Sequence, residues 1–93
     1  MVEPFALTDA HRLARTILTT GAVTFSQHAR DEMAKDKLVD VDITNVLRGG
    51  YCESHDLIQG TWRYRVRTPK IVVVIAFRSE TELCVVTAWR VVK

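Results

Sequence analysis

The hydrophobic pattern of this chain changes its period at Gly49-Gly50, and this change limits the possible folds more than any other feature. Before the two glycines, apolar residues recur every three or four positions, which is typical of helices with one buried side. After them, apolar and polar residues alternate, which is typical of strands with one buried face. The sequence therefore predicts a helical half followed by a β half within one domain, residues 1–93.

The helical half is expected to hold three helices, with a short strand between the first and the second. Side chains that can cap a helix precede the apolar stripes, and glycines follow the first and third stripes. The expected boundaries are Thr8 and Gly21 for the first helix, residues 22–25 for the strand, Ser26 for the start of the second helix, and Asp40 or Asp42 to Gly49-Gly50 for the third.

The β half is expected to form four strands, over residues 51–58, 61–68, 71–78 and 83–91. The connections between them are short, and short connections join antiparallel neighbours. Ile71–Phe77 is apolar throughout, so we expect this strand to be central and covered on both faces. The predicted fold class is α+β, with helices on one face of a four-stranded antiparallel sheet that also has a short edge strand.

Positive charge is concentrated in the β half. Residues 61–93 contain seven basic and two acidic residues, whereas residues 1–60 contain six basic and nine acidic residues. A basic sheet beside an acidic helical half indicates a surface that binds a polyanion such as RNA. This pattern by itself does not separate an enzyme from a binding protein.

Three arginines, Arg63, Arg65 and Arg67, alternate with apolar residues in the second of the four strands. Alternate residues of a strand lie about 6.7 Å apart on one face, so three guanidinium groups can follow an extended phosphate backbone. The other interpretation is a solvated strand whose charges prevent sheets from aggregating. The charge asymmetry favours anion binding. Arg78 and Arg90, near the ends of the last two strands, either extend this phosphate-binding row or point into water.

His28, in the first turn of the second helix, is the candidate for acid–base chemistry, because a neutral imidazole can exchange a proton near pH 7. A lone histidine is, however, more often structural. Tyr64 either donates its phenol hydroxyl to a phosphate or packs in the core with that hydroxyl at the rim. Trp89 is expected in the core, with base stacking as the lesser alternative. His11 and His55 are expected at the surface.

No metal or cofactor is expected. The two cysteines, Cys52 and Cys84, lie in expected strands, where a free thiol behaves as a small apolar group of a reduced cytosolic protein. Cys52 and His55 have a spacing that metal sites use, but in a regular strand their side chains point to opposite faces. No apolar segment is long enough to span a bilayer and no secretory signal follows Met1, so we expect a cytoplasmic protein without a membrane partner.

Several short motifs follow one another along the chain in the same order as in a known family. They are Phe25-Ser26-x-His28-Ala29-x-x-x-Met33, Val46-Leu47-x-Gly49, Tyr64-Arg65-Val66, Val72-Val73-Val74 and Val85-Val86-Thr87. In this order they resemble a small bacterial toxin-like domain family, which is related to the MqsR toxins and more distantly to RelE-like toxins and barnase-like ribonucleases. The resemblance covers residues 10–91, nearly the whole chain.

The resemblance implies a ribonuclease-like α+β fold and the toxin half of a toxin–antitoxin pair. Such a toxin cuts RNA without a metal and is silenced by a cognate antitoxin, which is expected to be a small DNA-binding protein. The resemblance is also compatible with a toxin that forms a homodimer. The residues assigned are His28, Tyr64 and Arg65 for catalysis, and Arg63, Arg67, Arg78 and Arg90 for phosphate binding. MqsR-type enzymes rely on Lys, Gln and Tyr in the sheet, where this chain offers arginines. The alternative function is a non-catalytic module that binds nucleic acid or protein.

Overall fold

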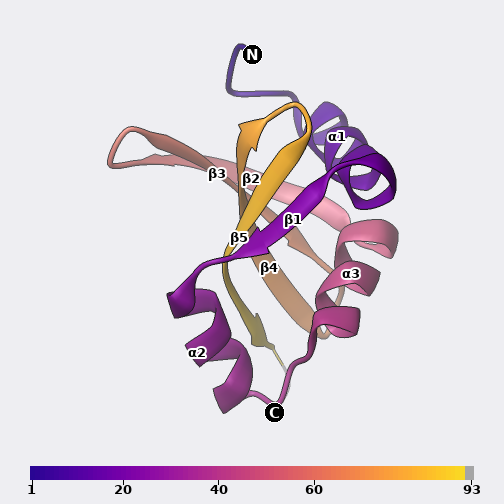
Figure 1. Cartoon of the computed structure of the whole chain (residues 1–93), viewed down its shortest axis with the longest axis vertical. Coiled ribbons are helices and arrows are strands. Elements are labelled where there is room, and N and C mark those ends of the chain that lie inside the picture. The colour runs from indigo at the N-terminus through magenta and orange to yellow at the C-terminus, as the bar shows by residue number, and fades with distance from the viewer. Residues whose placement is uncertain (92–93) are drawn as a thin grey trace.

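Within residues 1–91, three helices and one five-stranded sheet form the α+β fold that the sequence predicts (Figure 1). The computed structural model describes residues 1–91. In chain order the elements are α1 (Leu7–Thr20), β1 (Ala22–Phe25), α2 (Gln27–Lys35), α3 (Asp40–Gly49), β2 (Tyr51–Ile58), β3 (Thr61–Arg67), β4 (Ile71–Ser79) and β5 (Glu82–Arg90). All eight elements lie where the sequence predicts them, and the ends that were predicted differ from the observed ends by at most two residues.

The sheet has the strand order β1-β5-β4-β3-β2. Strands β2 to β5 form an antiparallel meander, as predicted from their short connections. The edge strand β1 runs parallel to β5, so the sheet is mixed and not antiparallel throughout. Since two helices and three strands separate β1 from β5 in the chain, no tight turn forces them to run in opposite directions.

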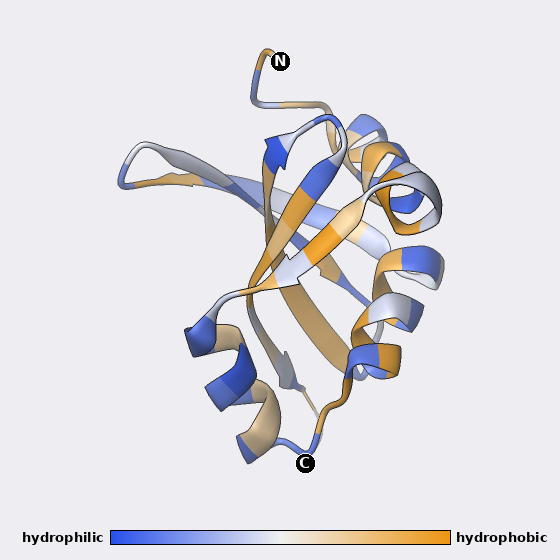
Figure 2. Cartoon of the chain, viewed as in Figure 1, coloured by the Kyte–Doolittle hydropathy of each residue, from blue (hydrophilic) through white to orange (hydrophobic). Residues whose placement is uncertain are grey.

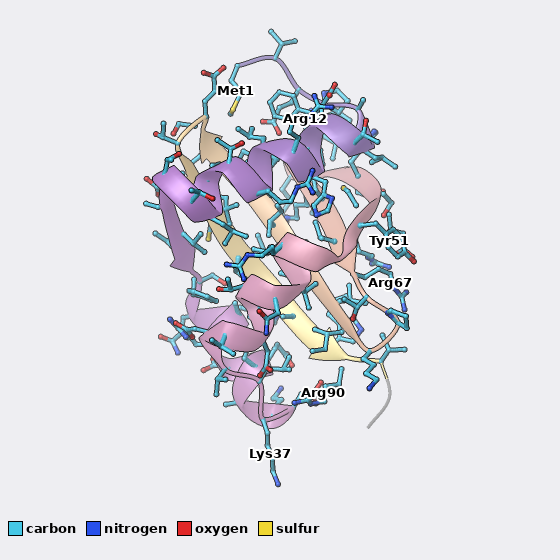
Figure 3. The ribbon with its side chains drawn as sticks, turned by 90° about the vertical axis from the view of Figure 1, so that its right-hand side faces the viewer. Met1, Arg12, Lys37, Tyr51, Arg67 and Arg90 are labelled. Carbon is cyan, nitrogen blue, oxygen red and sulfur yellow. The ribbon has the colours of Figure 1, made fainter. Side chains whose placement is uncertain are left out.

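The core lies between the sheet and the helices. Helices α1 and α3 lie across one face of the sheet (Figure 3), and α2 packs against β5. The apolar strand β4 runs through the middle of the sheet (Figure 2). Its residues Val73, Ile75 and Phe77 belong to the buried core, together with Tyr64 and Val66 of β3. We call the face turned away from α1 and α3 the open face.

The open face of β4 is covered by long side chains of the neighbouring strands. Val72 is 2 % exposed, although it points away from the core formed with α1 and α3. Its ladder partners are Arg67 on β3 and Trp89 on β5, so their side chains stand on either side of it. The apolar sequence of β4 predicts that both of its faces are covered. Side chains of the neighbouring strands β3 and β5 therefore cover its open face.

The helix starts agree only partly with the expected caps. Ser26 caps α2 as predicted, because its hydroxyl oxygen accepts a hydrogen bond of 3.0 Å from the Ala29 N–H. The prediction of Thr8 as a cap is wrong: α1 begins at Leu7, with Ala6 at the cap position and no side-chain cap bond. Helix α3 begins at Asp40 after Val39, whose N–H donates to the carboxylate of Asp42 at 2.9 Å.

Gly49 and Gly50 are expected to respond in opposite ways to replacement by alanine. A Cβ on Gly50 would lie 2.5 Å from the Arg67 carbonyl oxygen and 2.6 Å from that of Val46, and both are backbone atoms that cannot rotate away. A Cβ on Gly49 meets no atom within 4 Å. We expect Gly50→Ala to cost about 1–3 kcal/mol and to lower Tm by roughly 5–20 °C.

The matched control is Gly49→Ala, which places the same methyl group in an open position at the end of α3. Because alanine is the better helix former, its unfolding free energy should stay the same or rise by up to about 1 kcal/mol. Thermal melts of both variants check the pair. Equal melting temperatures would contradict the close packing of α3 against β3.

Candidate functional site

The three alternating arginines of β3 lie side by side on the open face. In the ladder Arg67 pairs with Val72 and Arg65 with Val74, while Tyr64 and Val66 between them face the core. Two of the arginines form ion pairs: the side chain of Arg65 is 44 % exposed, and that of Arg67 is 23 % exposed. The alternation along β3 therefore produces the row of guanidinium groups that the sequence predicted.

Two carboxylates of β2 accompany this row, and the sequence reasoning missed both. Glu53 lies 3.9 Å from Arg65 and 3.4 Å from Arg67, measured between carboxylate oxygens and Nη1 atoms. Asp56 is the ladder partner of Arg63. The position of Asp56 follows from the two-residue turn at Gln59-Gly60, which sets the register of the hairpin.

The position of Glu53 depends on a β-bulge that no sequence signal revealed. The ladder shifts between Cys52 and Ser54, so Glu53 has no partner of its own on β3. The bulge also places Cys52 and His55 on the same face of the sheet, where they pair with Val66 and Tyr64. The expectation that the side chains of Cys52 and His55 point to opposite faces is therefore wrong. Burial raises the pKa of the Cys52 thiol, so it is a poor nucleophile.

A hollow of about 200 Å³ lies beside the arginine row. Arg63, Arg65 and Trp89 line it, together with Asp56, Ile58, Val74 and Thr87. The Arg65 guanidinium carbon lies 5.5 Å from the centre of the Trp89 indole ring. The Nε atom of Arg63 is buried and has no hydrogen-bond partner within the protein. Such an unpaired buried donor is rare in folded proteins and calls for an explanation.

Arg63 also lines a second, wider hollow of about 490 Å³. Arg78 lines it from the end of β4, and Ala76 and Cys84 are among the other residues that line it. The structure thus places Arg78 near the arginine row, through the hollow that it shares with Arg63. Three guanidinium groups, those of Arg63, Arg65 and Arg78, thus line two adjoining depressions.

Arg90 does not belong to this group, and its expected role in phosphate binding is corrected. Its backbone N–H donates to the Asp36 carboxylate and its Nε to the Asp36 carbonyl oxygen, each at 2.8 Å. Figure 3 shows Arg90 beside Lys37 at the end of the molecule, well separated from Arg67. Arg90 therefore holds the carbonyl end of α2 against β5, which is a structural role.

Tyr64 is fully buried on the helix side of β3, and the structure does not bring its hydroxyl to Arg65. The hydroxyl donates to the Glu3 carboxylate at 2.8 Å and accepts from the Phe5 N–H at 3.1 Å. Burial, reinforced by Glu3, raises the pKa of Tyr64 to about 12. A phenol that holds its proton this firmly in the core fastens the N-terminal segment and is poorly suited to proton transfer.

His28 also lies apart from the arginine row. Its side chain is 64 % exposed on α2 and its Nε2 lies 3.9 Å from a carboxylate oxygen of Glu32. It lines neither of the two hollows. The three residues expected to be catalytic are therefore not assembled, and Arg65 forms an ion pair with Glu53 instead.

The other two histidines are partly buried and do not lie free at the surface. His11 Nε2 lies 2.9 Å from the Leu47 carbonyl oxygen, which links α1 to α3. His55 packs edge-on against Trp62 and Tyr64. Within residues 1–91 no three metal-binding side chains gather into a group. None of the helices described there has both the length and the apolar character needed to cross a membrane.

The high pKa of Tyr64 predicts a loss of stability at alkaline pH. The phenol titrates at about 10 in an unfolded chain and at about 12 when folded. The neutral phenol is thus favoured by folding, so its contribution is complete below pH 10 and disappears as pH rises through 12. Between these values the wild type should lose about 2–3 kcal/mol of unfolding free energy that Tyr64→Phe does not lose.

Urea unfolding at pH 8 and near pH 11.5 checks this prediction. At pH 8 the Tyr64→Phe variant should be less stable by about 1–2 kcal/mol, because it lacks the hydrogen bonds to Glu3 and Phe5. The difference should shrink at the higher pH. A constant difference at both values would contradict a titrating, buried phenol.

Comparison with known proteins identifies one family model that matches residues 25–90 of the chain. Its description is "Domain of unknown function (DUF4258)". The match begins at the last residue of β1 and ends with β5, so it includes all the residues of the open face described above. No curated protein and no solved structure matches the chain.

Proposed function

This chain belongs to the DUF4258 family, and we propose that it is a metal-independent endoribonuclease of the toxin type that binds RNA on the open face. The observation that carries this proposal is the row of Arg63, Arg65 and Arg67 with the Glu53 carboxylate against two of them. Guanidinium groups in a row suit consecutive phosphates, and a carboxylate beside them can act as a base.

The reaction that fits this arrangement is transesterification of the RNA backbone. The ribose 2′ oxygen attacks the adjacent phosphorus while its proton passes to Glu53. The bond from phosphorus to the 5′ oxygen breaks, and that oxygen takes a proton from a water molecule; protonated Glu53 then gives its proton to the hydroxide that remains. Arg65 and Arg67 stabilise the negative charge that grows on the phosphate oxygens. The products are one RNA end with a 2′,3′-cyclic phosphate and one with a 5′ hydroxyl.

The toxin assignment draws on the resemblance to the MqsR and RelE-like toxins. A cognate antitoxin that covers the open face would occupy the same guanidinium groups and block RNA. The proposal moves proton transfer from His28 and Tyr64 to Glu53, because Glu53 contacts Arg65 and Arg67 while the other two do not.

The second candidate is a non-catalytic RNA-binding module that uses the same face. The separation of His28 and Tyr64 from Arg65 favours it. The open face would then supply salt-dependent affinity: three phosphate contacts predict a slope of about −2 for log K against log salt on single strands.

Purified protein incubated with labelled RNA in EDTA distinguishes the two candidates. We expect fragments that end in 2′,3′-cyclic phosphate and growth arrest when the protein is expressed alone. RNA that is bound but stays intact would establish the binding module in place of the nuclease. RNA that is neither bound nor cut at low salt would exclude both.

A further inference from the structure

Trp89 lies on the open face and not in the core, where alternation along β5 had placed it. The ladder pairs Trp89 with Val72 and Thr87 with Val74, on the same face as Arg67 and Arg65. The displacement comes from the register shift in β5 opposite Val74 and Ile75. A large aromatic ring therefore stands, partly exposed, at the edge of the arginine row.

The distance between ring and arginines suits a nucleotide. Trp89 and Arg67 are two strands apart in one ladder row, which corresponds to about 9.5 Å between their backbones. The long side chains of Arg67 and Trp89 make the gap between their ends shorter than this backbone distance. Val72, between them, is covered by their side chains, and the apolar β4 residue that lines the hollow is Val74 in the neighbouring ladder row. A phosphate held at the arginines would thus carry its base sideways, over Val74 and toward the indole.

The contact with Arg65 keeps the ring near the site. The guanidinium carbon lies 5.5 Å from the ring centre, within the range of cation–π attraction. Both groups line the same hollow of about 200 Å³. The hollow thus combines a charged group for phosphate with an aromatic surface for a base.

From this arrangement we propose that Trp89 is the stacking platform for an unpaired base of single-stranded RNA. The proposal rests on the proposed function and adds the substrate class to it. A base must be free of its duplex to lie on the ring, since paired bases are already stacked on both sides. An acidic protein segment would satisfy the arginines but would leave the flat ring without a matching partner.

A double-mutant cycle with two nuclease-resistant probes tests the platform. The first probe is a fluorescein-labelled 2′-O-methylated hexauridylate, and the second is the same backbone without bases. We expect Trp89→Leu to weaken binding of the first probe by about 5- to 150-fold and binding of the second by less than about 2-fold. Trp89→Phe should retain most of the affinity, because it keeps an aromatic ring.

Fluorescence gives a second measurement that does not depend on the stability of the Trp89 variants. In Trp62→Phe the indole of Trp89 is the remaining tryptophan, and the base-bearing probe should quench it more strongly than the baseless probe. Equal quenching by both probes, or equal loss of affinity for both in Trp89→Leu, would overturn the platform and leave Trp89 as a cover for Val72.

The outcomes separate this inference from the proposed function. If RNA is still cleaved while Trp89→Leu binds both probes like the wild type, the nuclease stands and the platform is rejected. If the wild type binds neither probe at low salt, both are rejected. Capture of a protein segment by the open face, with no affinity for either probe, would likewise reject the platform.

Discussion

Replacement of Arg65 by alanine is expected to slow RNA cleavage by about 10²–10³-fold, because it removes a donor aimed at the charge that develops on the phosphate. Its side chain is 44 % exposed and its ion pair with Glu53 spans 3.9 Å, so the fold depends little on it. Single-turnover cleavage rates at saturating protein measure the effect directly. Thermal unfolding should change by only a few degrees.

The matched control for this variant is Arg15→Ala. Arg15 is an exposed arginine of α1, which lies on the other side of the sheet, so the variant has the same change in net charge. Its cleavage rate should equal that of the wild type. Equal losses in the two variants would mean that only overall charge matters, and the site on the open face would be abandoned.

Replacement of Glu53 by glutamine is expected to have the largest effect, a decrease of about 10²–10⁴-fold in the cleavage rate. Glutamine has nearly the same shape but cannot take the proton of the 2′ hydroxyl. Removal of its negative charge should also raise RNA affinity, since Arg65 and Arg67 lose their carboxylate partner. Slower cleavage with tighter binding is therefore the expected signature of Glu53→Gln.

Binding and cleavage must be measured separately to interpret this variant. A residue that only positions Arg65 and Arg67 would weaken binding when replaced, and the rate at saturation would change little. Asp31→Asn serves as the control, because it removes a carboxylate from α2, whose exposed surface is remote from the contacts of Glu53. An unchanged rate in Glu53→Gln would assign the proton transfer to another group.

The row of arginines on β3 could be predicted because it depends on local geometry alone. Alternate side chains of any strand point to the same face, and the apolar Tyr64 and Val66 indicate which face meets the core. The turn at Gln59-Gly60 likewise sets Asp56 opposite Arg63. For the same reason the elements themselves were predictable, since each depends on the period of a short segment.

The remaining features of the site depend on contacts between segments that are distant in the chain. Glu53 reaches two arginines through a bulge, and a register shift in β5 brings Trp89 to the open face. Arg90 faces away from the row because it pairs with Ile71 on the helix-side face, where Asp36 at the end of α2 binds it. Neither the bulge in β2 nor the register shift in β5 contains a glycine or proline that would indicate it, so the sequence predicts regular strands.

By itself the sequence determined that this chain is α+β, that its sheet is basic, and that three arginines share one face of β3. Tertiary structure alone decided which other groups meet them: Glu53 and Trp89 were brought in, while His28 and Arg90 were kept away. The physical reason is one of range. Backbone periodicity acts within a few residues, whereas a shift of one residue in a ladder moves a side chain to the other face of the sheet.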